Sequence, residues 1–241
     1  MREPRLFVAQ PLTPGSEVEL DDRSRRHVSQ VLRLRIGHQV ILFDGSGTDF
    51  AAELTHCDRV CCRARIDGVR STEATASLPI GLAVGISRGE RMDFVVQKSV
   101  ELGVATIWPL TTERSIVQMD AQRRDKRMAH WRGVLIGACE QSGRSRLPVL
   151  HEPTGLAEWL EAHPQGLMLH HGAQPGLHAL PAPTTPIHLL VGPEGGLSDA
   201  ECTLAERHHY IAVRLGPRIL RTETAPLAAI AAIQTLWGDF R

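Results

Sequence analysis

The sequence has little of what marks several specialised classes of protein. Its net charge is zero, because 27 basic residues balance 27 acidic ones, so it has no general excess of positive charge for coating nucleic acid. Its longest apolar tracts, 78–86 and 226–237, are shorter than the roughly 20 residues that a membrane-spanning helix needs. The first 15 residues contain no apolar stretch typical of a secretory signal. We therefore expect a cytoplasmic protein with no membrane segment.

Cysteine is also scarce and shows no framework spacing. The five cysteines are an odd number, which indicates reduced thiols rather than a disulfide scaffold. The pairs His56-Cys57 and Cys61-Cys62 raise the question of a metal site. They lack a second half with matching spacing, and the segment has the pattern of a strand, so we expect no metal.

The length and a hydrophobic content of 42% fit one large domain or two small ones. The first 70 residues have short apolar or alternating runs separated by turn-forming clusters such as Pro14-Gly15 and 44–47. This pattern predicts a small β-barrel with one helix near 24–34; its strands are expected at 5–9, 39–43, 50–55 and 60–66. The small polar residues 71–77 are the best candidate for a linker.

After the linker, strands alternate with helices. Two capping-box patterns, Ser87-x-x-Glu90 and Ser198-x-x-Glu201, predict helix starts, and two further helices are expected at 120–143 and 226–237. The predicted strands are 78–86, 104–110, 147–150, 166–170, 187–191 and 211–215. Such alternation predicts an α/β domain with a mostly parallel sheet. We place the two domains at residues 1–72 and 73–241.

Two loops between a strand and a helix hold the most informative residues. Val191–Ser198 contains three glycines, which let a backbone approach a ligand, but no Gly-Lys-Ser/Thr follows, and Glu194 would repel phosphate. Leu215–Pro226 surrounds the apolar pair Ile219-Leu220 with arginine, threonine and glutamate side chains. Apolar walls with a few polar groups indicate a pocket for a small molecule other than a polyphosphate. The glycine cluster could equally form a mere tight turn.

The loop sequences GPEGGLSDAE and LGPRILRTETAPLAAI resemble the signature of the SPOUT methyltransferase superfamily. They resemble in particular the branch that methylates N3 of a uridine in 16S ribosomal RNA. The similarity covers nearly the whole chain in the family's order and is weak only at 150–186. Other matching segments are Arg5–Val8, His27, Val31–Arg33, Gly37, Asp44-Gly45, Lys98–Val104 and Glu140–Arg144.

This resemblance implies an N-terminal PUA-like barrel that helps to hold RNA and a C-terminal domain with a trefoil knot. It also implies S-adenosylmethionine as the cofactor, a homodimer, and 16S ribosomal RNA as the partner, either naked or within the small subunit. The residues expected around the cofactor are Leu169, His170, Gly192, Pro193, Gly195, Gly196, Leu215, Gly216, Ile219, Leu220, Thr222, Thr224 and Ala225.

Methylation at N3 needs a group that stabilises charge developing on the uracil ring, or a base that takes the N3 proton. Arg221 is the first candidate for charge stabilisation because its planar fork lies in the cofactor loop. Glu194 and Glu223 are candidates to accept the proton or to orient Arg221, and His27 and His170 are weaker bases. The alternative for both glutamates is a purely electrostatic role at a helix N-terminus.

RNA contact is expected from arginine, which makes up 25 of the 27 basic residues. Residues 88–146 carry a net charge of +4 and residues 147–241 one of −4, so the zero total conceals a basic segment. A GC-rich genome also favours arginine. The predicted RNA-binding residues are Arg5, Arg25, Arg26, His27, Arg33, Arg123, Arg127, Gln141 and Arg144.

Three alternatives stay open at this point. The chain could be an RNA-binding assembly factor without turnover, or a superfamily methyltransferase that modifies the ribose 2′-oxygen or another base. It could also be a nucleotide hydrolase that uses Val191–Ser198 as a phosphate loop, which would bind ATP or GTP.

Overall fold

The computed structural model describes residues 3–76, 78–115 and 121–240. The chain forms two compact units: unit 1 comprises Met1–Thr75 and Ile136–Leu147, and unit 2 comprises Ala76–Leu135 and Pro148–Arg241. Helix α3 (Ala121–Ser142) begins in unit 2 and ends in unit 1. The predicted start of this helix at Asp120 lies outside the described residues. We retain the domain boundary at 72/73 as a proposal.

Unit 1 is built on a five-stranded sheet with the order β1-β3-β4-β5-β2. The strands are β1 (Arg5–Phe7), β2 (Glu17–Glu19), β3 (Gln39–Phe43), β4 (Thr48–Cys57) and β5 (Cys62–Thr72). Strand β1 pairs with β3 in parallel, and the other pairs are antiparallel. The predicted helix at 24–34 is instead a short α1 (Asp22–Arg26) continued by a π-helical turn at His27–Val31.

Alternating apolar residues fill the core of unit 1. Leu42, Phe50, Leu54 and Ile66 from neighbouring strands are buried, and Val28 from the π-helical turn joins the same cluster. Three residues of β2 were missed by the sequence analysis because Glu-Val-Glu offers only one apolar side chain. That valine is buried, so β2 serves as the edge strand that closes the core.

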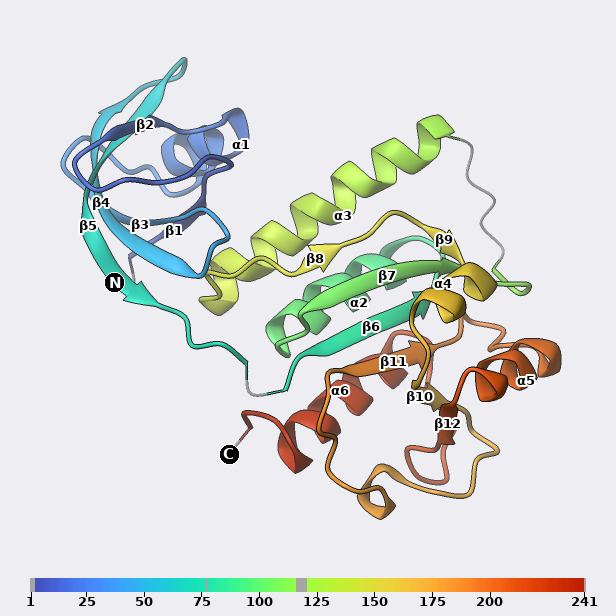
Figure 1. Cartoon of the computed structure of the whole chain (residues 1–241). Coiled ribbons are helices and arrows are strands. Elements are labelled where there is room, and N and C mark those ends of the chain that lie inside the picture. Colours follow the sequence, from blue (N-terminus) through green and yellow to red (C-terminus); the bar gives the residue numbers. More distant parts are fainter. Residues whose placement is uncertain (1–2, 77, 116–120, 241) are drawn as a thin grey trace. The chain divides into compact units, whose positions relative to one another are not determined.

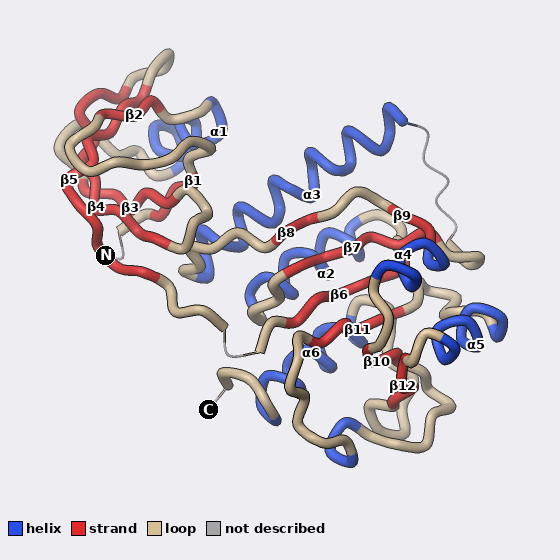
Figure 2. Tube along the Cα trace, viewed as in Figure 1, coloured by secondary structure: helices blue, strands red, loops and turns tan. Residues whose placement is uncertain are grey.

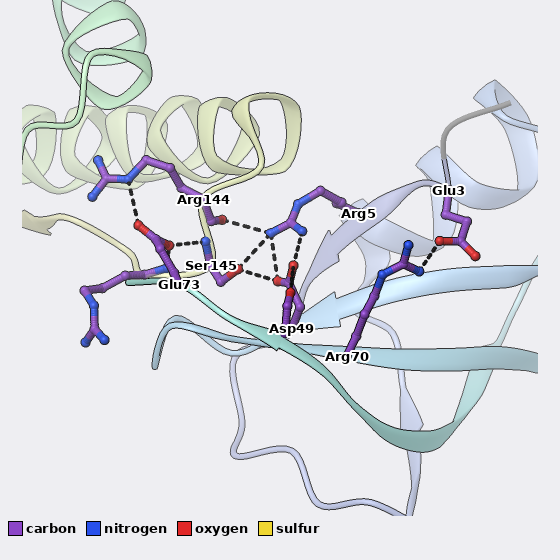
Figure 3. A network of polar contacts seen from close by, with 9 residues as sticks. Glu3, Arg5, Asp49, Arg70, Glu73, Arg144 and Ser145 are labelled. Carbon is purple, nitrogen blue, oxygen red and sulfur yellow. Dashed lines mark hydrogen bonds and ion pairs between the residues drawn. The ribbon is translucent and has the colours of Figure 1, made fainter. Parts of the chain in front are cut away.

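A buried ion pair between Arg5 and Asp49 also holds the second segment of unit 1 through hydrogen bonds to Arg144 and Ser145 (Figure 3). The Arg5 guanidinium donates to both oxygens of Asp49, with 2.9 Å between Nη2 and Oδ1, and also to Ser145 Oγ at 3.1 Å and the Arg144 carbonyl at 3.2 Å. The side chains of Arg5 and Asp49 are only 5% and 9% exposed. Because its guanidinium lies in the interior, we withdraw Arg5 from the RNA-binding candidates.

Unit 2 contains a parallel sheet with the strand order β12-β10-β11-β6-β7-β8, as Figures 1 and 2 show. The strands are β6 (Ile80–Gly85), β7 (Thr106–Thr111), β8 (Val149–Leu150), β10 (Gly166–Leu169), β11 (Ile187–Val191) and β12 (Tyr210–Val213), with β9 (Thr154–Gly155) pairing with β7. The prediction of an α/β fold with a mostly parallel sheet is confirmed.

Helices cover both faces of this sheet. Helices α2 (Glu90–Glu101) and α6 (Thr224–Leu236) pack together, and α6 contacts β6 and β11. On the other face, α4 (Leu156–Ala162) and α5 (Asp199–Arg207) cover a cluster that includes Trp108 and Trp159. Helix α4 was missed because a seven-residue segment shows too little periodicity, and so was a 3-10 turn at Leu177–Ala179.

One predicted capping box is confirmed and the other is wrong. Ser198 Oγ accepts from the Glu201 N–H, and the Glu201 carboxylate accepts from the Ser198 N–H, at the start of α5. At the start of α2, by contrast, the N-cap is Gly89, with φ of 57° and no side-chain cap. The Ser87 hydroxyl lies 3.2 Å from Thr222 Oγ1 instead, so a tertiary contact replaces the predicted local one.

We predict that Asp49→Asn lowers the free energy of unfolding by about 3–5 kcal/mol, because it leaves the buried Arg5 charge without its counter-ion. The matched control is Glu3→Gln, which breaks the exposed Glu3–Arg70 pair and should cost no more than about 1 kcal/mol. Urea denaturation of both variants measures the difference. Equal losses in the two variants would contradict a stabilising role for the buried pair.

Candidate functional site

A cavity of about 670 Å³ opens in unit 2, where β10, β11 and β12 end. The carboxyl ends of parallel strands lie at one edge of a sheet, so the loops that follow them converge there. The loop after β11 begins at Gly192, and the loop after β12 runs to α6. Both glycine-containing loops therefore line the same cavity, although about twenty residues separate them in the sequence.

The cavity contains nearly all the residues expected around a cofactor. Each of those residues lines it except Thr224, which is the first residue of α6. Arg221, Glu194 and Glu223, the candidates for catalysis, also line it. Val191, Leu197 and Arg218 also line it and lie within the two loops predicted to form the pocket. Five further lining residues lie outside those loops and were not predicted, namely Arg91, Arg114, His171, Val213 and Arg214. Several of these are sequence neighbours of the predicted residues, whereas Arg91 and Arg114 come from distant elements.

Arg91, in the first turn of α2, bridges the two carboxylates of the cavity. Its Nη1 donates to Glu194 Oε1 at 3.0 Å, and its Nε lies 3.8 Å from Glu223 Oε2. The two glutamates come from different loops, so this guanidinium connects the loop after β11 with the loop after β12. Both carboxylates thus have Arg91, and not Arg221, as their ion-pair partner in the described part of the chain.

Glu194 is held in its charged form. Burial by itself would raise the pKa of this carboxyl, but hydrogen bonds from the Arg88 backbone N–H at 3.0 Å and from Arg91 outweigh it, and the pKa lies below the ordinary value. A carboxylate with a lowered pKa is a weak base. Glu194 therefore suits an electrostatic role better than proton transfer.

Glu223 differs from Glu194 because one of its carboxylate oxygens accepts no hydrogen bond within the described residues. Its Oε2 atom is buried, and within the described residues no hydrogen bond reaches it, because Arg91 Nε is too distant. A buried carboxylate oxygen without a hydrogen bond is costly, so a donor from a ligand would relieve it. This oxygen is the most direct indication that the cavity receives a group that donates a hydrogen bond.

Two hydroxyl groups hold the loops in place. Thr222 Oγ1 donates to the Gly192 carbonyl at 3.3 Å and lies 3.2 Å from Oγ of Ser87, which follows β6. On the other side, Arg114 Nη1 donates to the carbonyls of Gly195 and Leu197 at 2.9 and 3.2 Å. The glycine-rich loop is thus fixed from two sides, which suits a preformed binding site.

Glycine is required at particular positions of this cavity. Gly196 and Gly216 have φ of 69° and 83°, a region that other residues rarely adopt, and a Cβ at either would meet nothing within 4 Å. At Gly192 a Cβ would lie 2.7 Å from the Leu197 backbone nitrogen, so that glycine permits the tight turn itself. The loop after β12 adds an apolar surface, because Ile219 is 81% exposed beside the cavity.

The remaining RNA-binding candidates differ in exposure. In unit 1, Arg26, His27 and Arg33 are exposed, whereas Arg25 is partly buried and donates to the Arg59 carbonyl. Gln141 is exposed, and Arg144 is partly buried with its Nε 3.6 Å from Glu73. On α3 within unit 2, Arg123 is exposed and Arg127 is partly buried. Exposure alone thus favours Arg26, His27, Arg33, Arg123 and Gln141 over Arg25, Arg127 and Arg144.

No helix among residues 3–76, 78–115 and 121–240 is both long and apolar enough to cross a membrane. The same part of the chain holds no group of three or more histidine, cysteine, aspartate or glutamate side chains arranged to bind a metal ion.

Comparison with known proteins shows extensive similarity. Residues 74–234 match the family described as an RNA methyltransferase domain, and residues 20–60 match an RNA methyltransferase PUA domain. Ribosomal RNA small subunit methyltransferase E of Buchnera aphidicola is 31% identical over 99% of this chain and 95% of its own. The protein of the same name from Bacillus subtilis is 30% identical over 88% of this chain and 89% of its own.

Two solved structures are similar over the full length of both chains. One is ribosomal RNA small subunit methyltransferase E from Neisseria gonorrhoeae bound to S-adenosylmethionine, with 42% identity and a TM-score of 0.92. The other is a putative methyltransferase from Legionella pneumophila in complex with the same cofactor, with 38% identity and a TM-score of 0.95.

We predict that Arg91→Gln raises the pKa of Glu194, because the carboxylate loses a cation and a hydrogen bond that both favour its charged form. Carboxyl-carbon NMR titration of Glu194 measures this shift. Lys98→Gln is the matched control, since Lys98 lies on the same helix but pairs with Glu101. An unchanged Glu194 titration in Arg91→Gln would show that the backbone hydrogen bond alone sets its pKa.

Proposed function

The chain belongs to the ribosomal RNA small subunit methyltransferase E family, and from that premise we propose that it transfers a methyl group from S-adenosylmethionine to N3 of a uridine in 16S ribosomal RNA. The chain has the SPOUT-type α/β fold and the PUA domain expected of such an enzyme. The observation that carries the proposal is the cavity, where the family's two signature loops meet. The choice of N3 rests on the resemblance of those loops to the uridine-N3 branch.

The residues present fit S-adenosylmethionine. The free Glu223 Oε2 atom would accept a hydrogen bond from one of its hydroxyl or amino groups, and the glycine backbones at 196 and 216 leave open space beside them. The apolar Ile219-Leu220 pair would pack on adenine. When bound, the cofactor supplies a methyl group on a positively charged sulfur. The carboxylates of Glu194 and Glu223 would favour that charge electrostatically.

In the proposed reaction, Arg221 stabilises the negative charge that develops on the uracil oxygens as N3 loses its proton. Arg221 is exposed and lines the cavity. Within the described residues, Glu194 and Glu223 pair with Arg91 and not with Arg221, so the Arg221 guanidinium is available to substrate. Glu223 is the better of the two candidates for the proton acceptor. Glu194, with its lowered pKa, holds Arg91 and the loop in position.

The RNA-binding surface is proposed to include Arg26, His27 and Arg33 in unit 1, together with Gln141. Arg25, Arg123, Arg127 and Arg144 stay in the proposed set. From the resemblance we also propose a homodimer, a trefoil knot in the C-terminal domain, a cytoplasmic location, and action on rRNA within or before assembly of the small subunit.

The function is tested by incubating the protein with labelled S-adenosylmethionine and small-subunit ribosomal RNA, followed by nuclease digestion and mass spectrometry. We expect a single 3-methyluridine. A methyl group on ribose or on another base would replace the proposal with that of a different methyltransferase. Absence of methyl transfer to both naked RNA and assembled subunits would favour an assembly factor.

We predict that Arg221→Ala lowers kcat by about 10²–10³-fold, the usual cost of removing a group that stabilises transition-state charge. Cofactor affinity should change much less, because the role is exerted on the uracil. Single-turnover methylation and calorimetry measure the two quantities. Arg207→Ala, an exposed position on α5 outside the cavity, is the control. Wild-type turnover in Arg221→Ala would refute the assignment.

We predict that Gly196→Val abolishes measurable binding of S-adenosylmethionine, since a β-branched residue at φ of 69° forces the loop to change conformation. Calorimetry with the cofactor alone measures this. The control is Gly155→Val, because Gly155 has an ordinary φ of −70° and a Cβ there would meet nothing within 4 Å. Retained affinity in Gly196→Val would place the cofactor elsewhere.

A further inference from the structure

Three of the five cysteines lie together at the tip of the β4–β5 hairpin, beside the turn that Arg25 contacts. Cys57 is the last residue of β4, Cys62 is the first of β5, and Cys61 precedes it in the turn. All five cysteines of the chain are in the thiol form in the structure. The proposed function uses none of these three.

Cys57 and Cys62 face each other directly across the two strands. They are register partners in the antiparallel pair, and their sulfur atoms are 2.6 Å apart. The Asp58 N–H donates to the Cys61 carbonyl next to them, which makes the Cys57–Cys62 pair a non-hydrogen-bonded one, the type in which Cα atoms are about 4.5 Å apart. That separation falls at the short end of the range that a disulfide spans.

Several hydrogen bonds fix the conformation of the turn that joins the two strands. Asp58 Oδ1 accepts from the backbone N–H groups of Val60 and Cys61, both at 2.7 Å, and Arg25 on α1 donates to the Arg59 carbonyl. The strand register and these hydrogen bonds therefore place the two thiols next to each other. Cys57 is partly exposed, whereas Cys62 is fully buried. An oxidant from solvent would reach Cys57 first.

We propose that Cys57 and Cys62 form a reversible disulfide when the protein meets a peroxide. The Cys57 thiolate attacks one peroxide oxygen and breaks the O–O bond, giving a sulfenic acid and, after protonation of the leaving oxygen, water. The Cys62 sulfur then attacks the sulfenic sulfur and displaces hydroxide, which takes the Cys62 proton and leaves as a second water. Two thiols lose two electrons in total, and the peroxide gains them.

The surroundings of Cys61 and Cys62 make both thiols poor first nucleophiles. Burial raises the pKa of the Cys62 thiol, and the neighbouring cysteines raise it further, so Cys62 stays protonated and does not start the reaction. Burial and the Glu19 carboxylate raise the pKa of Cys61 as well. Neither thiol competes as the first nucleophile at neutral pH.

A tryptic digest tests the proposal on the unmodified protein. Arg59 lies between the two cysteines, so trypsin places Cys57 in one peptide and Cys61 with Cys62 in another, Val60–Arg63. After stepwise addition of hydrogen peroxide and alkylation of free thiols, we expect the two peptides to be joined, and to separate on reduction. Fragmentation should place the link on Cys62. Cys139 and Cys202, which have no cysteine neighbour in sequence, serve as internal controls.

Two variants complete the test. Cys61→Ser should retain the link, and Cys57→Ser should abolish it, with the remaining thiols alkylated in full. A link that survives in Cys62→Ser would mean that Cys61 is the partner and would overturn the assignment. Sulfinic acid at Cys57 with no linked peptide would overturn it too. Because the digest of the wild-type chain locates the bond by itself, the result does not depend on any variant folding.

Discussion

The parallel order of the strands in unit 2 is the constraint on which its site depends. Strand β10 lies between β11 and β12, and all three point the same way, so the segments that follow them are delivered to one edge of the sheet. An antiparallel strand in any of these three places would send its loop to the opposite edge. The cavity then exists because chain direction brings Leu169-His170, the glycine-rich loop and Leu215–Ala225 together, before any side chain has been considered.

The loops of the site could be predicted from the sequence because their chemistry is local. A cluster of glycines and an apolar pair among polar residues can each be recognised within one short stretch of sequence. The structure then shows Gly196 at a positive φ and Ile219 exposed beside the cavity. Arg91 could not be found in this way, because its role arises only when α2 packs beside loops that come about a hundred residues later. Ser87 shows the converse: a good local capping pattern gives way when the hydroxyl reaches Thr222 instead.

The number of arginines in the sequence likewise predicts RNA binding less well than the environment of each arginine does. Arg5 was counted with the basic surface, yet its guanidinium is enclosed by Asp49 and Ser145 and lies over the Phe43 ring, 5.1 Å from the centroid. Arg26 and Arg33, close in sequence to partly buried Arg25, remain exposed. The composition shows only that buried and exposed arginines are both basic. Which of them can meet a phosphate is decided by burial and by pairing with a carboxylate, both of which are tertiary properties.

The same reasoning separates the charges of the cavity into two groups. Arg91 lies between Glu194 and Glu223 and carries one positive charge against their two negative ones, so this group of three residues by itself favours a cationic ligand. Arg221, in the loop after β12, is not neutralised by either carboxylate and favours an anion. Transfer of a methyl cation from a sulfonium to a deprotonating uracil needs both signs in one site. Because Arg91 pairs with both carboxylates, neither of them draws Arg221 into an ion pair, and the two signs of charge stay separate within one cavity.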